Sequence, residues 1–258
     1  MIARVRVDRI ILLVACGILL AGCETVLEPS AWIRHRSGEG APKIDDRGVF
    51  FLYSSDAPLT VSNFSGQGGT FKLSFDHPPP FSLSLASAFT KDGYLLTAGH
   101  SAAKHILVIG VMEGEVRAVS ARVVLKKSFG NYGTDLAILH VDRSIDFPLP
   151  LGQFADGERS VYAIGCEREP TLQIIVMGGK VRGAINSLAS SEVQLLDTDL
   201  PSWHGDSGGG VVLPDGRLIG VITGFKTEWS ALHNAKLVCA PNRALVESIV
   251  AADREAHR

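Results

Sequence analysis

The chain has 258 residues, and its 25 basic and 27 acidic side chains leave a formal net charge of −2 at pH 7. The isoelectric point lies near 6.4 and the charges are interspersed, so the chain lacks the basic surface that a nucleic-acid-binding protein needs. The length allows a large buried core, and the histidines show no metal-ligand spacing, so neither a metal nor another cofactor is expected.

The first 22 residues are typical of a secretory signal peptide. A basic start precedes an apolar run: Arg4, Arg6, Arg9 and then residues 10–20. The run is shorter than the roughly 20 apolar residues that span a membrane. Residues 20–23, Leu-Ala-Gly-Cys, resemble a bacterial lipobox, in which cleavage leaves Cys23 to carry a lipid. Glu24 resembles the outer-membrane sorting pattern, so we expect a lipid-anchored protein of the cell envelope that faces the periplasm.

Residues 23–46 combine the lipidated cysteine with a polar segment containing Pro and Gly, and we expect a flexible tether there. Beyond it, short apolar or alternating runs recur between turn residues, at 49–53, 70–75, 105–111 and 116–125. This pattern is typical of all-β barrels. The Gly-rich stretch 65–69 lacks the Lys-Ser/Thr ending of a phosphate-binding loop, so it is interpreted as a hairpin tip.

Two positions in the N-terminal half of the chain carry candidate catalytic groups. His100 ends an apolar, strand-like run that stops in the small residues 97–99. Asp135 directly precedes the apolar run 136–141, which is typical of a buried strand. We therefore expect an imidazole at a strand end and a carboxylate held at the start of another strand.

A boundary between two strand-rich regions falls near residues 146–150. Strand-like runs then resume at 161–165, 172–177, 193–196, 211–213, 218–223 and 236–240. Asn242 is a candidate helix cap, followed by apolar residues at helical spacing. Before the run at 211–213 lies the Gly-rich turn Trp203-His204-Gly205-Asp206-Ser207-Gly208-Gly209-Gly210.

Ser207 in this turn is a candidate nucleophile. A serine hydroxyl is weak at neutral pH and needs a general base with a carboxylate behind it, roles that His100 and Asp135 can fill. The chain order His, Asp, Ser differs from the orders found in α/β-hydrolases and subtilisins, which disfavours an esterase of unrelated fold. A lone Gly-Asp-Ser-Gly is more often an ordinary turn. Ser207 is therefore a candidate nucleophile only in combination with His100 and Asp135.

Three blocks carry a family resemblance: residues 86–100, 134–139 and 198–209. Together they resemble the trypsin-like (chymotrypsin-fold) serine peptidases, and within these the bacterial HtrA-type branch. The resemblance implies an all-β fold of two six-stranded antiparallel Greek-key barrels with a C-terminal α-helix. The peptidase domain would span 47–258, with barrels at 47–147 and 148–240 and the helix at 241–258. The PDZ domain of many HtrA-type proteins is expected to be absent.

The resemblance also implies roles for single residues. His100, Asp135 and Ser207 would form the triad, and the main-chain N–H groups of Gly205 and Ser207 the oxyanion hole. The substrate pocket would be lined by Pro201, Ser202, Thr223, Gly224 and Phe225. The pocket shows no carboxylate for basic side chains, and Ile222 stands where Glu-specific relatives have histidine, so we expect a preference for small or medium apolar side chains.

The implied function is a serine endopeptidase that acts on proteins or peptides in extracytoplasmic processing or quality control. The alternative is a catalytically silent binding or chaperone module on the same fold. Asp206 resembles the aspartate that pairs with a newly released N-terminal amine in trypsin-like zymogens, but residues 47–50 only faintly resemble a cleavage site. We therefore expect an internal partner and constitutive activity. Cys166 and Cys239 form either a disulfide or two buried free thiols.

Overall fold

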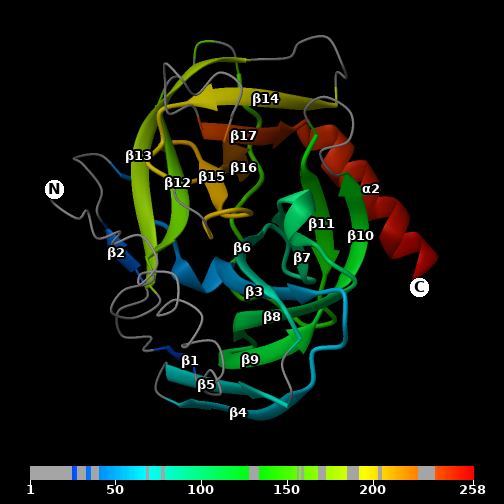
Figure 1. Cartoon of the computed structure of the whole chain (residues 1–258). Helices are drawn as coiled ribbons and strands as arrows, with labels where there is room; N and C mark the ends of the chain where they lie inside the picture. Colours follow the sequence, from blue (N-terminus) through cyan, green and yellow to red (C-terminus); the bar gives the residue numbers. More distant parts are fainter. Residues whose placement is uncertain are drawn as a thin grey trace, which may run out of the picture.

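The computed structural model describes residues 25–27, 33–35, 41–67, 70–76, 79–127, 134–155, 157, 160–167, 173–184, 192–202, 205–225 and 236–258. These residues form three β-sheets, two short 3₁₀ helices and one α-helix (Figure 1). Two of the sheets build the two halves of the molecule, and the helix joins them. The candidate cysteine for lipidation, Cys23, lies outside the described residues.

The first unit is a seven-stranded antiparallel sheet with the order β10-β11-β7-β6-β3-β8-β9. Its strands are β3 (Val49–Ser55), β6 (Ser82–Ala88), β7 (Tyr94–Thr97), β8 (His105–Met112), β9 (Glu115–Ser120), β10 (Arg122–Lys127) and β11 (Leu136–His140). Beside it, β4 (Val61–Gln67) and β5 (Thr70–Phe75) pair as a hairpin, with Gln67 opposite Thr70, as the Gly-rich stretch predicted.

The expected single strand at 116–125 is instead two strands that meet at Ala121. β9 and β10 lie at opposite edges of the sheet, and the N–H of Ala121 donates to the carbonyl of Ile106. The chain turns a corner here because the sheet curls, and one straight strand cannot serve both edges of a curled sheet. The first unit is therefore a half-barrel in which β9 and β10, joined through Ala121, occupy the two edges of the sheet.

The second unit is a closed barrel of six strands. They are β12 (Ser160–Glu167), β13 (Gln173–Ala184), β14 (Val193–Thr198), β15 (Gly210–Val212), β16 (Leu218–Phe225) and β17 (Lys236–Pro241). The sheet order β12-β15-β16-β17-β14-β13 closes on itself through the antiparallel pairing of β12 with β13. The predicted fold class of two antiparallel β units followed by a helix is thus confirmed.

The segment expected to be a flexible tether contributes two short strands. β1 (Thr25–Leu27) pairs with β5, and β2 (Ile33–His35) pairs in parallel with β13. Both strands add to the edges of existing sheets, where unpaired main-chain groups are available to a passing extended segment. Backbone pairing of this kind depends little on side-chain pattern, which is why composition did not indicate it.

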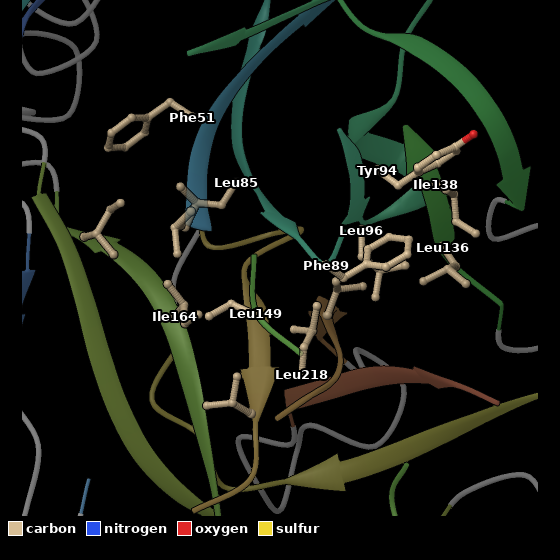
Figure 2. Packing of buried hydrophobic residues seen from close by; sticks show 14 of the residues in the cluster. Phe51, Leu85, Phe89, Tyr94, Leu96, Leu136, Ile138, Leu149, Ile164 and Leu218 are labelled. Carbon is tan, nitrogen blue, oxygen red and sulfur yellow. The ribbon is translucent and has the colours of Figure 1, made fainter. Parts of the chain in front are cut away.

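Successive residues on a strand point to opposite faces, and both faces of β3 are buried. Phe50 and Leu52 belong to a core inside the first unit, whereas Phe51 and Tyr53 belong to a second core that residues of both units share. Figure 2 shows this interface core, where Leu85 and Leu96 of the first unit lie near Ile164 and Leu218 of the second. A third cluster fills the second barrel. Buried apolar residues thus fill the interface between the units as well as the two interiors.

Helix α2 (Arg243–Ala256) connects the end of the second barrel to the first unit and runs beside β10 (Figure 1). Its predicted cap is confirmed, because the side-chain oxygen of Asn242 accepts a hydrogen bond from the N–H of Ala244 at 2.8 Å. Near its end, Asp253 accepts two hydrogen bonds of 2.6 Å from Arg122 and one of 2.8 Å from Tyr94. No helix among the described residues is long and apolar enough to cross a membrane.

The contacts of Asp253 predict an acid-dependent stability. The hydrogen bonds from Arg122 lower the pKa of Asp253 from 3.8 to about 2, so the stabilisation is full above about pH 4 and is lost as the pH falls toward 2. Asp253→Asn is expected to lower the free energy of unfolding by about 1–2 kcal/mol at pH 7 and by progressively less below pH 4. Urea unfolding across this pH range measures the difference.

Glu247→Gln is the matched control on the same helix. Glu247 pairs with Arg243 at 2.8 Å, but both side chains are about half exposed. Removing such an exposed pair is expected to change the free energy of unfolding by less than about 0.5 kcal/mol. Equal losses in the two variants would mean that the bidentate contact with Arg122 does not stabilise the docked helix.

Candidate active site

His100 and Asp135 meet just beyond the paired ends of β7 and β11. The two strands are antiparallel neighbours with Thr97 opposite Ala137, so the residues after one and before the other lie side by side. His100 Nδ1 is 2.5 Å from Asp135 Oδ2, and the main-chain N–H of His100 donates to Oδ1 at 2.7 Å. The side chain of Asp135 is 1% exposed and that of His100 is 44% exposed. A buried carboxylate therefore holds an accessible imidazole.

This contact fixes the tautomer of the neutral imidazole. A carboxylate can only accept hydrogen bonds, so the proton of neutral His100 sits on Nδ1. The lone pair is then on Nε2, at the other side of the ring. His100 is thus prepared to accept a proton through Nε2, and the charge of Asp135 stabilises the imidazolium that results.

Gly99 makes the contact possible. A Cβ at this position would overlap the carbonyl oxygen of Lys127 and would lie 2.9 Å from Asp135 Oδ1. The chain therefore passes so close to the carboxylate that only glycine fits before the histidine. In the sequence this position was no more than part of a small-residue turn.

Ser207 lies in the turn between β14 and β15 at one rim of the second barrel. Gly205 and Gly208 on either side have φ of +106° and +79°, a region that favours glycine. The N–H of Gly208 donates to the carbonyl of Ile222 at 2.8 Å, which ties the turn to β16. The glycines of the motif thus meet a conformational requirement of the turn.

The turn packs directly against the first unit, on the strands that lead to His100. The N–H of Leu85 in β6 donates to the carbonyl oxygen of Ser207 at 3.0 Å. A Cβ on Gly208 would overlap Thr97 Oγ1 and would lie 3.1 Å from the N atom of Ala98. Ser207 is therefore positioned from both barrels, next to the end of β7 from which His100 follows. No sequence signal indicated the Leu85 contact.

The candidate oxyanion-hole donors are available. Among the residues that the structure describes, the main-chain N–H groups of Gly205 and Ser207 donate to no protein acceptor. N–H groups of this kind, held by a fixed turn, can bind an oxygen on which negative charge develops. The neighbouring Trp203 and His204 lie outside the described residues.

The five predicted pocket residues lie on two segments at this same rim. Pro201 is exposed and Ser202 is buried, in the connection after β14. Thr223 is buried and its hydroxyl donates to the carbonyl of Leu237 at 3.3 Å, while Phe225 pairs with Lys236 through the main chain. Among the described residues, a Cβ on Gly224 at the end of β16 would meet nothing within 4 Å.

Both cysteines of the second barrel are free thiols. Cys166 is near the end of β12 and Cys239 is in β17, the strand positions that the sequence predicts. Burial raises the pKa of Cys239 to about 12, which keeps that thiol protonated at neutral pH.

Among the described residues, no group of three His, Cys, Asp or Glu side chains could hold a metal ion.

A half-barrel that carries a His–Asp pair and a closed barrel that carries a serine turn define the chymotrypsin-like class of fold. The family model of the trypsin-like peptidase domain matches residues 86–221, which is just over half of the chain. The chain therefore belongs to the trypsin-like peptidase family. The match includes the segments around His100, Asp135 and Ser207.

Solved structures that include HtrA-type proteases share this fold. HtrA-type protease AlgW with a decapeptide has a TM-score of 0.53 and 23% identity over 79% of this chain and 63% of that one. A serine endoprotease from Yersinia pestis has a TM-score of 0.53, 20% identity and coverages of 80% and 62%. Deg5 has a TM-score of 0.51, 17% identity and coverages of 80% and 86%.

The chain thus spans less than two thirds of the length of the AlgW and Yersinia structures. At these identities the likeness establishes the fold. None of the functionally curated proteins compared with the chain is similar enough to count as a match.

The close approach at Gly99 predicts a severe effect of a single methyl group. Gly99→Ala would push the chain away from Lys127 and Asp135, and we expect the free energy of unfolding to fall by about 2–4 kcal/mol. Gly183→Ala in β13 is the control, because a Cβ there meets nothing within 4 Å. Urea unfolding compares the two, and similar stabilities would show that the chain can yield at Gly99.

Proposed function

We propose that this protein is a serine endopeptidase in which Ser207 is the nucleophile, His100 the general base and Asp135 the carboxylate that orients it. The observation that carries the proposal is the contact of His100 Nδ1 with the buried carboxylate of Asp135. Such a contact leaves Nε2 as the base and places a full negative charge behind it. A merely structural histidine at a strand end needs neither feature.

In the proposed reaction, Ser207 Oγ attacks the carbonyl carbon of a peptide bond while His100 Nε2 accepts the hydroxyl proton. The imidazolium then donates that proton to the leaving amine nitrogen, and the peptide bond breaks to leave an acyl-enzyme. A water molecule repeats the sequence on the ester, with His100 again as the base. Asp135 remains ionised throughout.

The free N–H groups of Gly205 and Ser207 support the oxyanion part of the proposal. In the tetrahedral intermediate the former carbonyl oxygen becomes negatively charged, and two preset donors stabilise it without any movement of the turn. Removal of a single oxyanion donor typically costs a serine protease about 3 kcal/mol of transition-state stabilisation. The positive φ of Gly205 belongs to the conformation that holds this donor.

The proposed substrates are proteins or peptides. Structures of HtrA-type protease AlgW contain a tripeptide or a decapeptide. We place the substrate side chain beside Gly224, where an added Cβ would meet no described atom within 4 Å. We infer a preference for small or medium apolar side chains before the cleaved bond, because Pro201, Ser202 and Thr223 offer no charge to a basic or acidic one. Extracytoplasmic processing or quality control is the proposed context.

A fluorophosphonate probe tests the chemistry directly, because the serine oxygen displaces fluoride from phosphorus only when the site activates it. We expect stoichiometric labelling of the purified wild-type chain and none of Ser207→Ala. Asp135→Asn is expected to lower the hydrolysis rate of a peptide library about 10⁴-fold, since the amide fixes the wrong tautomer of His100.

Different results would separate the alternatives. Wild-type chain that is folded but not labelled at Ser207 would favour a catalytically silent binding or chaperone module. Wild-type hydrolysis by Asp135→Asn would remove Asp135 from the triad. Dominant cleavage after Lys, Arg or Glu in the library would contradict the apolar preference while leaving the serine chemistry intact.

We further propose that Cys23 carries a lipid that anchors the domain to the cell envelope, at the outer membrane and facing the periplasm. The basic start, the short apolar run and the small residues before Cys23 support this address. In a Gram-negative host, labelled palmitate is expected to be incorporated into the wild-type chain and not into Cys23→Ala. Incorporation into both forms would contradict an anchor at Cys23.

A further inference from the structure

The residue before the nucleophile is a carboxylate buried inside the second barrel. Asp206 is 1% exposed, and its Oδ1 accepts a hydrogen bond of 2.7 Å from the main-chain N–H of Cys166 in β12. A Cβ on Gly165 would lie 2.9 Å from the same oxygen, so glycine at that position makes room for the carboxylate. Alternate residues of β12, Val161 and Ala163, belong to the core of this barrel. Asp206 therefore enters the barrel from its rim.

A lysine faces the same space from the opposite wall. Neighbouring strands of the closed barrel are antiparallel, so the ends of β12 and β16 and the start of β17 lie at one rim. Lys236 is the first residue of β17, and it shares a strand face with Val238 and Ala240, which belong to the barrel core. Lys236 thus points toward the interior at the rim that Asp206 enters.

The two charges interact. Burial lowers the pKa of the Lys236 ammonium from 10.5, and the negative charge of Asp206 acts in the opposite direction. A carboxylate in the interior is costly unless opposite charge and hydrogen bonds offset the loss of water. The N–H of Cys166 supplies a hydrogen bond, and Lys236 supplies positive charge.

The segment that faintly resembles an activation site is built into the first unit. Val49 is fully buried at the start of β3, which pairs with both β6 and β8. Arg47 donates to Asp45 at 2.7 Å, and its guanidinium lies 3.3 Å from the ring centroid of Phe147. A Cβ on Gly48 would approach the carbonyl oxygen of Phe147 to 2.5 Å. An intact, packed chain at this point offers no amine to Asp206.

We propose that Lys236 is a positioning residue, whose charge holds the Asp206 carboxylate inside the barrel and thereby sets the Ser207 turn in its working conformation without proteolytic activation. The inference rests on the proposed function of that turn. The mechanical link is short, because the carbonyl oxygen of Asp206 accepts the N–H of Gly209 at 2.8 Å, and Gly208 is tied to Ile222. Fixing Asp206 therefore fixes the main chain that carries both oxyanion donors.

The kinetic test uses Lys236→Met, which keeps the length of the side chain and removes its charge, and Lys236→Arg, which restores the charge. Two peptides that differ only in valine or glutamate before the cleaved bond serve as substrates. Because the oxyanion donors act in the transition state, we expect Lys236→Met to lower kcat about ten- to hundredfold on both peptides with KM within about threefold. Lys236→Arg should recover most of kcat, and Lys180→Met at an exposed position of β13 should match the wild type.

Unfolding in urea tests the charge pair without any reference to catalysis. Lys236→Met leaves the Asp206 carboxylate without its opposing charge, so adding Asp206→Asn should raise the unfolding midpoint of Lys236→Met. The midpoint shifts of the two single variants, added together, should exceed the midpoint shift of the double variant. Such non-additivity indicates direct coupling between Lys236 and Asp206.

Three results would overturn the proposal. A loss in Lys236→Met that is confined to the glutamate peptide and appears in KM would make Lys236 a substrate-binding residue of the pocket. Additive midpoint shifts would show that Lys236 and Asp206 do not act as a pair. Full kcat in Lys236→Met would show that the turn needs no such charge. If the wild type itself is not labelled at Ser207, the proposed function fails, and the midpoint shifts still decide whether the pair exists.

Discussion

The contact between the serine turn and the first unit is the constraint on which the rest of the structure depends. Ser207 belongs to one barrel, and His100 with Asp135 to the other, so the site exists only where the two surfaces meet. The hydrogen bond from Leu85 to Ser207 and the approach of Gly208 to Thr97 fix that meeting at one point. The apolar interface core that includes Leu85 and Leu96 lies beside this contact.

Close approach explains why glycine occupies so many positions near the site. Gly99, Gly165 and Gly208 each stand where a side chain would overlap main chain or a functional carboxylate. Each glycine increases the entropy cost of folding, since an unfolded glycine is more mobile than other residues. The interface packing must offset that cost. The site is thus a region where local sequence preference is overridden by tertiary contact.

Much of this arrangement could be predicted from the sequence, because period-two patterns and the three motif blocks are local signals. The strands next to His100, Asp135 and Ser207 fall where expected, as does the cap at Asn242. The corner at Ala121 could not be predicted, since a bent and a straight strand share one alternating pattern. The main-chain partner of Asp206 could not be predicted either, because a hydrogen bond from a main-chain N–H does not depend on which side chain that residue carries. Gly165 within a strand was the available hint, as interior glycines often mark close approach.

Helix α2 follows the last strand of the second barrel and grips the first unit at Tyr94 and Arg122. Tyr94 begins β7, whose other end leads to His100, and it lies opposite His140 at the end of the strand that Asp135 precedes. The helix therefore contacts the first unit at the ends of β7 and β11 opposite to those at which His100 and Asp135 lie. Separation of the two units would also break the contacts of Asp253 with Tyr94 and Arg122, because helix α2 is covalently continuous with the second barrel. The geometry of the proposed catalytic site is thereby coupled to a helix that supplies none of its proposed residues.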